Sequence, residues 1–467
     1  MALTQVSTGG VKDDAVTTDK LADAINTERT ANTAKDLTAL SASNLASGTV
    51  PDARFPATLP AASAANLTSI PAANITGDLP AISGANLTGI STTPADGSIT
   101  QAKLNFPVAN RNLIINGAMQ VAQRGTSSTS TGYQTVDRIS HFNGGTDENP
   151  TYTQADVASG TTPYSLGFRK SFKITNGNQT SGAGADDYIH FVYKVEAQDL
   201  ANSGWNYTSS SSNITLSFWV KASVAQNYYG YLLTADGSTR SFAFETGSLS
   251  ADTWTKVTVV IPGNSNLTFN NDNGNGLEID FSVFRGTNFT GTAGTVGSWV
   301  SFTSSQRHPD CTPTWYTTND ATFELTGVQL EVGSVATDFE HRSFGQELAL
   351  CQRYFYMHAF GAYVYTPNRP DSTAMGMATQ YTTTAFYGII NFPVQMRAHP
   401  SFVKSLGTDR LLFYYNTGAQ GFNDITTQDF GVNASIIKYY DSLNSSAQSG
   451  WVQLNNNNAY VGFDAEL

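Results

Sequence analysis

The sequence has little charge, and the charge that it has is mostly negative. Asp, Glu, Lys and Arg make up 13% of the 467 residues, about half of the usual share of roughly a quarter. With 25 Lys and Arg against 37 Asp and Glu, the formal net charge is −12 at pH 7. No surplus of cations is therefore present to neutralise phosphates or anionic lipid headgroups, and we expect neither nucleic acid nor a membrane surface as a partner.

Cysteines and long apolar runs are also scarce. Cys311 and Cys351 are the two cysteines, too few for a disulfide framework or for a zinc site of their own. No run approaches the roughly 18 apolar residues of a membrane-spanning helix, and the N-terminus lacks the apolar segment of a secretion signal. We therefore expect synthesis in the cytosol and no insertion into a membrane.

Aromatic residues are nearly missing from the first 106 residues, which contain two Phe, no Trp and no Tyr. Such a segment cannot build a core of its own, so something outside it must bury its few apolar residues, and self-association is the simplest candidate. Within it, residues 59–70 (LPAASAANLTSI) recur as residues 79–90 (LPAISGANLTGI). Such repeats often bury their apolar faces only against copies of themselves.

We therefore predict a thin, repetitive multichain shaft over residues 41–106, rich in Ala, Ser, Thr and Asn. A disordered linker is the alternative, and the segment is a spacer in either case. Residues 1–40 precede the shaft. A short helix is expected there, because Leu21 and Ile25 have i, i+4 spacing.

After the shaft, short alternating runs separated by Gly, Asn and Ser predict a mainly β fold. We predict a jelly-roll β-sandwich over residues 107–342 and a second, smaller β-sandwich over residues 358–467. In the first, Leu216, Phe218 and Val220 should share one buried face, because side chains alternate along a strand. The predicted strands are Ile214–Ala222, Trp254–Ile261, Leu277–Phe284, Thr322–Leu330, Ala362–Tyr365, Ala385–Phe392, Leu411–Tyr415, Ile436–Tyr440 and Ala459–Ala465.

Residues 343–357 are predicted to form a short helix that connects the two sandwiches. Ser343 and Gln346 have the spacing of a capping box at its start. Apolar residues then recur at the a/d spacing of a coiled-coil seam: Phe344, Leu348, Cys351 and Phe355. Three chains could meet through this stripe on an axis, but packing of the helix on its own sandwich explains the pattern nearly as well.

No common catalytic motif is present, and the six histidines have no metal-ligand spacing. Cleavage of a glycan would need two carboxylates about 5–10 Å apart, and the local pairs are Asp147–Glu148, Asp186–Asp187 and Glu278–Asp280. Neighbours in a strand point to opposite faces. Glu278 and Asp280 can share a face, although a solvated strand edge is favoured. We therefore expect no enzyme.

We also expect no cofactor. Structural calcium is conceivable at the oxygen-rich run Asn270–Gly276. That run lacks the spaced acidic residues of an EF-hand loop, so a flexible turn is favoured.

Aromatic residues beside Asn-rich turns make the C-terminal sandwich the best candidate for a binding site. Glycan sites combine exposed Tyr and Trp rings with polar side chains that bind hydroxyl groups. In a pair of adjacent aromatics, one ring should face the core. The candidate ligand-binding residues are Tyr414, Tyr415, Tyr439, Tyr440, Asp441 and Trp451.

Five stretches are similar to one known family. They are Arg111–Gly125, Leu325–Arg342, Glu347–Phe355, Phe392–Pro400 and Tyr460–Leu467. They resemble parts of bacteriophage tail fibres, the receptor-binding proteins of these viruses. The resemblance carries over no catalytic residue and no receptor contact.

The resemblance implies an elongated homotrimeric fibre with a jelly roll that is similar to carbohydrate-binding modules. Its N-terminal attachment segment, residues 1–40, would bind other tail or baseplate proteins of the virion. Its C-terminal tip would bind a host surface polysaccharide or another receptor. We therefore predict a non-enzymatic tail fibre, made in the host cytoplasm and located in the virion. The alternatives are a structural or capsid-decorating fibre that binds another virion protein, and a tailspike that cleaves polysaccharide.

Overall fold

The structure is a computed structural model that describes residues 110–292, 294–361, 374–382, 384–405, 411–415, 418–422, 424–440, 449–455 and 459–467. The chain divides into Met1–Ile90 and Ser91–Leu467, and every described residue belongs to the second unit. The predicted attachment segment, the predicted shaft, the strand Ala362–Tyr365 and the candidate Asp441 lie outside the described residues. The described chain is mainly β, as predicted, and its sheets are antiparallel.

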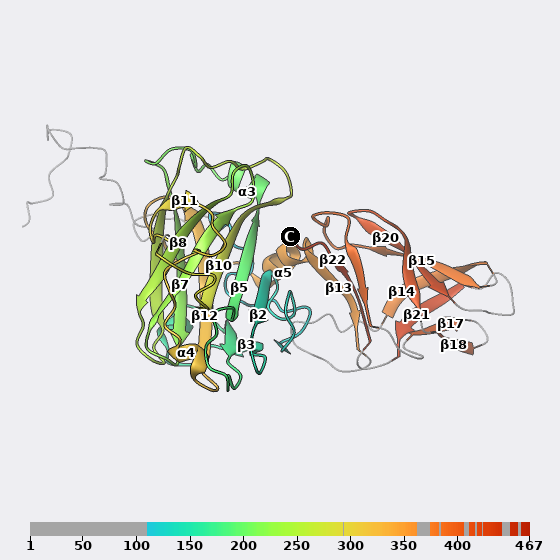
Figure 1. The fold of residues 1–467 in the computed structure, drawn as a ribbon. Coiled ribbons are helices and arrows are strands. Elements are labelled where there is room, and N and C mark those ends of the chain that lie inside the picture. The colour runs from blue at the N-terminus through green and yellow to red at the C-terminus, as the bar shows by residue number, and fades with distance from the viewer. Residues whose placement is uncertain are drawn as a thin grey trace, which may run out of the picture. The chain divides into compact units, whose positions relative to one another are not determined.

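Two six-stranded sheets share the core of the first sandwich (Figure 1). Sheet A has, in spatial order, β1 (Ser127–Ser128), β3 (Thr151–Asp156), β4 (Lys170–Thr175), β12 (Thr322–Val332), β6 (Asn213–Ala222) and β9 (Thr255–Pro262). Sheet B has β11 (Trp299–Ser301), β8 (Arg240–Ser248), β7 (Asn227–Thr234), β10 (Asn275–Arg285), β5 (Tyr188–Glu196) and β2 (Ile139–Gly144). The four strands predicted in this region are confirmed, with ends within two residues.

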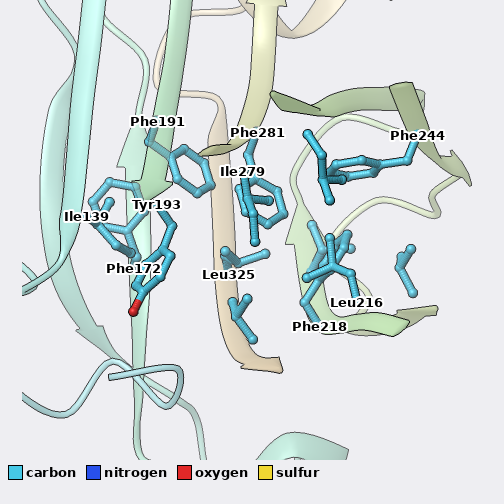
Figure 2. Packing of buried hydrophobic residues seen from close by; sticks show 14 of the residues in the cluster. Ile139, Phe172, Phe191, Tyr193, Leu216, Phe218, Phe244, Ile279, Phe281 and Leu325 are labelled. Atoms are coloured by element: carbon cyan, nitrogen blue, oxygen red, sulfur yellow. The ribbon is translucent and has the colours of Figure 1, made fainter. Parts of the chain in front are cut away.

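Period-two alternation builds the core of this sandwich. Leu216, Phe218 and Val220 of β6 are buried on one face, as predicted. Rings from sheet B meet them from the other side, with Phe218 and Phe281 packed edge to face at 5.2 Å between centroids. Figure 2 shows Leu216, Phe218 and Phe281 in one cluster with Phe191, Phe244 and Leu325. An aromatic core of this kind excludes water and fixes which faces of the two sheets remain outside.

The C-terminal region has two further sheets, and buried side chains from both belong to one cluster. Sheet C has β13 (Phe355–Phe360), β22 (Tyr460–Asp464) and β16 (Ser401–Lys404). Sheet D has β18 (Gly418–Phe422), β17 (Leu411–Tyr415), β21 (Ser449–Leu454), β14 (Ala374–Thr382), β15 (Ala385–Asn391), β20 (Ala434–Tyr440) and β19 (Ile425–Phe430).

Four short helices complete the described chain: α2 (Thr162–Ser165), α3 (Ala197–Ala201), α4 (Thr314–Thr317) and α5 (Phe344–Gln352). None of the helices in the described ranges combines the length and the apolar character that crossing a bilayer requires.

Helix α5 begins as predicted and ends earlier than predicted. The capping box between Ser343 and Gln346 is present. The helix ends at Gln352 rather than at residue 357, because Phe355 already begins β13, which pairs with β22. Pairing with a strand more than a hundred residues away overrides the local helical pattern.

Helix α5 and the residues around it connect the stretches that resemble tail fibres. The backbone N–H of Asn116 donates to the Glu347 carboxylate (2.5 Å), and Gln123 Nε2 donates to the carbonyl of Phe355 (2.7 Å). Arg397 donates to the carbonyl of Ala465 (2.7 Å). These stretches therefore form one network of contacts within the chain.

The most buried ion pair of this network joins Arg138 to Glu466. Arg138 is 1% exposed, its guanidinium lies 3.4 Å from the centre of the Tyr354 ring, and it donates to the carbonyl of Lys194 (2.7 Å). Its backbone has φ +73°, a conformation that residues other than Gly rarely adopt. Arg124 binds the same Glu466 carboxylate at 3.3 Å. The chain thus accepts backbone strain to place a guanidinium where the C-terminal segment can neutralise it.

Replacement of Glu466 by Gln should destabilise the protein by about 3 kcal/mol, because Arg138 would be left buried without a full counter-charge. The free energy of unfolding of the full-length protein in urea measures this loss. The matched control is Asp156→Asn, which removes the exposed ion pair with Lys170 and should cost less than about 1 kcal/mol. Equal effects of the two substitutions would contradict the structural role of Arg138.

Replacement of His141 by Phe should make the protein less sensitive to acid. Burial lowers the pKa of His141 to about 3, from about 6.5 in an unfolded chain. As the pH falls below 6.5, the unfolded chain therefore binds a proton that the folded chain does not, and the free energy of unfolding decreases. Between pH 7 and pH 5, wild type should lose about 2 kcal/mol more than His141→Phe. Parallel pH profiles from urea unfolding would contradict this assignment.

Candidate functional site

A cavity of about 420 Å³ lies on the outer face of sheet B. Side chains of β5 that alternate with the core residues Ile189 and Phe191 point toward it. Its wall is formed by Phe142, Tyr188, His190, Val192, Lys194, Tyr231, Glu278, Asp280, Arg285, Phe289 and Arg307. The volume is within the range of small-molecule sites, and the lining combines aromatic with charged groups.

A buried ion network forms the floor of this cavity. Asp280 Oδ2 accepts from Arg285 Nη2 (2.7 Å) and lies 2.7 Å from His190 Nδ1. Its other oxygen, Oδ1, accepts from Ser282 Oγ (2.8 Å). Burial alone would raise the pKa of Asp280, but Arg285 and His190 outweigh burial and hold this pKa below its ordinary value. Asp280 is therefore an anion at neutral pH.

Residues 286–292 and 302–310, on either side of β11 in the sequence, cover the neighbouring part of the same face. His308 is fully buried and stacks on Tyr229 of β7, with 5.3 Å between ring centroids. Arg307 lies over the Phe289 ring at 5.2 Å and over the Phe302 ring at 5.6 Å. These two segments leave part of the outer face open, and they supply Phe289 and Arg307 to the cavity wall.

A second candidate site is the outer face of sheet D. Tyr414 of β17 and Trp451 of β21 are directly opposite each other, and their rings stack with 5.1 Å between centroids and 12° between planes. Trp451 is 50% exposed. Met377 of β14 is the next partner of Trp451 across the sheet and is 65% exposed. We call Tyr414, Trp451 and Met377 the apolar row.

Further exposed side chains lie on the strands beside the apolar row. Ile389 of β15 is 64% exposed, and Tyr381 of β14 is 78% exposed and packs edge to face on Tyr387 at 5.1 Å. The alternate residues of the same strands, such as Phe386 and Phe413, are buried in the core. One face of sheet D therefore builds the core while the other presents a broad apolar surface to solvent.

The structure places the other candidate ligand-binding residues differently. Tyr439 is 1% exposed within the core cluster, and Tyr415 is half-buried against it, stacked on Phe413 at 5.8 Å. Tyr440 is the last residue of β20, and Asp441 lies outside the described residues. Of the adjacent pair, the structure stacks Tyr414 on the half-exposed Trp451 and packs Tyr415 against the core.

The predicted seam residues are likewise divided. Cys351 and Phe355 are buried by the chain itself. Phe344 is 37% exposed and Leu348 is half-buried. Of the four predicted seam residues, the two nearer the C-terminus are thus buried within the single chain, and the two nearer the N-terminus remain accessible.

Two of the three carboxylate pairs serve to hold loops. Asp147 accepts from the backbone and the hydroxyl of Ser181 (2.6 and 2.8 Å), and Asp187 accepts from the backbone of Gly184 (2.6 Å). The third pair, Glu278 and Asp280, lines the cavity. Its interpretation as a solvated strand edge is wrong, because β10 lies inside sheet B between β7 and β5.

The oxygen-rich run Asn270–Gly276 uses its side chains within the fold. Asp272 accepts from the backbone of Gly274 (2.9 Å), and Asn275 donates to Glu278 (2.8 Å). Across the described residues, no group of three or more His, Cys, Asp or Glu side chains has an arrangement that could hold a metal ion.

Sequence analysis missed the cavity because its residues come from four strands and a loop that are up to 165 positions apart, from Phe142 to Arg307. The one available signal was the outward alternation of Tyr188, His190 and Lys194 along a single strand. Polar and aromatic residues on the outer face of a sheet do not by themselves indicate that a loop will fold over it.

Comparisons with known proteins identify no family. No family model and no curated protein matches the chain. The enzymatically active domain of tailspike protein 4 from bacteriophage CBA120 is 11% identical with a TM-score of 0.25, and the match covers 47% of this chain and 21% of that one. The N-terminal cellulose-binding domain of Cellulomonas fimi β-1,4-glucanase C is 10% identical with a TM-score of 0.21, covering 46% and 99%.

A further similar structure is the N-terminal CBM22-1–CBM22-2 tandem domain from Paenibacillus barcinonensis. It is 9% identical with a TM-score of 0.23, and the match covers 77% of this chain and 100% of that one. At these identities and TM-scores, the similarities assign neither a ligand nor an activity to this chain.

Replacement of Asp280 by Asn should destabilise the protein by about 3 kcal/mol, because the buried Arg285 would lose its counter-ion. Urea unfolding of the full-length protein measures the change. Asp186→Asn is the matched control, since Asp186 is exposed and binds Asn288; it should change stability by less than about 0.5 kcal/mol. A stable Asp280→Asn variant would show that the floor of the cavity is not held by this ion pair.

Proposed function

We propose that the chain is a receptor-binding tail fibre of a bacteriophage and that its C-terminal sandwich binds a glycan on the host surface. The observation that carries the proposal is the stacked pair Tyr414–Trp451, with Trp451 half-exposed. Such a pair offers a flat aromatic surface to the apolar C–H face of a sugar ring. The stretches that resemble tail fibres support the same assignment.

Polar groups beside the rings favour a sugar ligand. Gln453 Nε2 donates to the Tyr414 hydroxyl (3.2 Å), which orients that hydroxyl at the edge of the apolar row. Thr379 and Ser449 form a hydroxyl pair on neighbouring strands (3.1 Å). Amide and hydroxyl groups at the rim of an aromatic surface are the groups that bind sugar hydroxyls.

Weak contacts at one site suffice if several sites act together. In the proposed homotrimer, three tips on each fibre, and several fibres on each particle, would raise the effective concentration of the second and later contacts. The low charge of the chain fits this mode, because such a surface does not adhere to the anionic cell envelope through long-range attraction.

In the proposal the cavity carboxylates organise the wall. Asp280 is held by Arg285 (2.7 Å) and Glu278 lies 3.6 Å from Lys194.

The second candidate function is a structural fibre whose C-terminal sandwich binds another virion protein. The exposed aliphatic side chains Met377 and Ile389 favour it, because they add apolar area without an aromatic ring or a hydrogen-bonding group. Protein and sugar would then compete for the same face of sheet D.

Replacement of Trp451 by Ala should weaken retention of the full-length protein on an array of bacterial surface polysaccharides by roughly tenfold or more. Release of reducing ends is assayed in the same wells, and none is expected. The matched control is Trp254→Ala, since Trp254 is a partly exposed Trp of the first sandwich that lies 5.3 Å from Lys221 Nζ.

Retention that survives Trp451→Ala would contradict the proposed site. Wild-type protein that binds no polysaccharide but captures purified virion proteins through the same residue would establish the structural fibre. Reducing-end release by wild type would establish an enzyme.

A further inference from the structure

The cavity on sheet B has one cation in excess of its anions. Asp280 is paired with Arg285 at 2.7 Å, and Glu278 with Lys194 at 3.6 Å. Arg307 is the third cation on the wall, and within the described residues neither cavity carboxylate pairs with it. A protein with a formal net charge of −12 thus places an uncompensated guanidinium in a concave site.

Arg307 is held by two neutral groups and keeps one donor without a partner. Nη1 donates to the carbonyl of Ser304, and the side chain also hydrogen-bonds to Tyr231 of β7. Nε is buried and has no hydrogen-bond partner in the described residues. A buried donor without a partner costs free energy, and a guanidinium bound only to neutral groups can still pair with a carboxylate.

Aromatic rings border the same cavity. Phe142 lies over His190 with 5.2 Å between ring centroids, and Tyr188 meets Phe289 edge to face at 5.6 Å. Phe142, Tyr188 and Phe289 are all partly exposed. A ligand that enters must therefore present an apolar face to these rings as well as an anion to Arg307.

We propose that this cavity is a second ligand site, separate from the apolar row of sheet D, and that it binds a saccharide that carries a carboxylate, of the uronate type. The carboxylate pairs with the Arg307 guanidinium, and the C–H face of the sugar ring packs on Phe289 and its aromatic neighbours. Arg285 is held by Asp280 and shapes the floor. The site stands on observations independent of sheet D.

The test compares ligands on the unaltered full-length protein by titration calorimetry. The probes are the trimers of galacturonate, glucuronate and mannuronate, each beside its carboxyl-reduced neutral counterpart, and a tri-aspartate peptide. At least one uronate should bind roughly tenfold or more tightly than its reduced form, with affinity that falls as salt is raised. Equal binding of both forms, binding of none, or binding of the peptide in place of the uronates overturns the proposal.

Variants then locate the site. Arg307→Gln should reduce uronate affinity by roughly tenfold or more. Arg169→Gln should leave uronate affinity unchanged. Arg169 is an exposed arginine that also donates to main-chain carbonyls and lies over a Tyr ring, but it directly precedes β4 of sheet A. Trp451→Ala should also leave uronate affinity unchanged, so failure of the sheet D site and failure of this one are distinguishable. Loss of uronate binding in Trp451→Ala but not in Arg307→Gln overturns the assignment to the cavity.

Discussion

The burial of the Arg138 guanidinium is the constraint on which the described structure depends. A buried cation is tolerated only when counter-charges and acceptors surround it. Here Glu466 supplies the charge, the carbonyl of Lys194 supplies an acceptor, and the Tyr354 ring supplies a face. These partners come from the C-terminal segment, from β5 and from the residue before β13, so one side chain contacts three parts of the chain.

The sequence predicted the strands better than it predicted their environment. Strict alternation in β6 identified its buried face, because this property is local to a strand. The end of α5 was wrong because Phe355 pairs with β22, a contact that no local pattern encodes. Sequence reasoning identified the stretches around Arg111–Gly125 and Tyr460–Leu467 by resemblance, and the structure shows that many of their polar residues bind one another inside the chain.

The two candidate sites differed in how far they could be predicted, for a physical reason. Composition named Trp451 and Tyr414 among six candidates, but alternation says only that one of two neighbouring rings faces the core and not which one. The cavity on sheet B depends on a loop that folds back over a sheet and on ion pairs between strands. The charge balance of the cavity depends on all of its residues. Arg307 is a surplus cation only because Arg285 and Lys194 are paired with the two cavity carboxylates.

The pairing of Arg138 with Glu466 spans 328 positions of sequence. During vectorial synthesis the strands of the first sandwich leave the ribosome long before the residue that neutralises their buried guanidinium. Until then, the first sandwich lacks the carboxylate that neutralises Arg138 and cannot reach its full stability. A chain that stops before Glu466 leaves this guanidinium without that counter-charge.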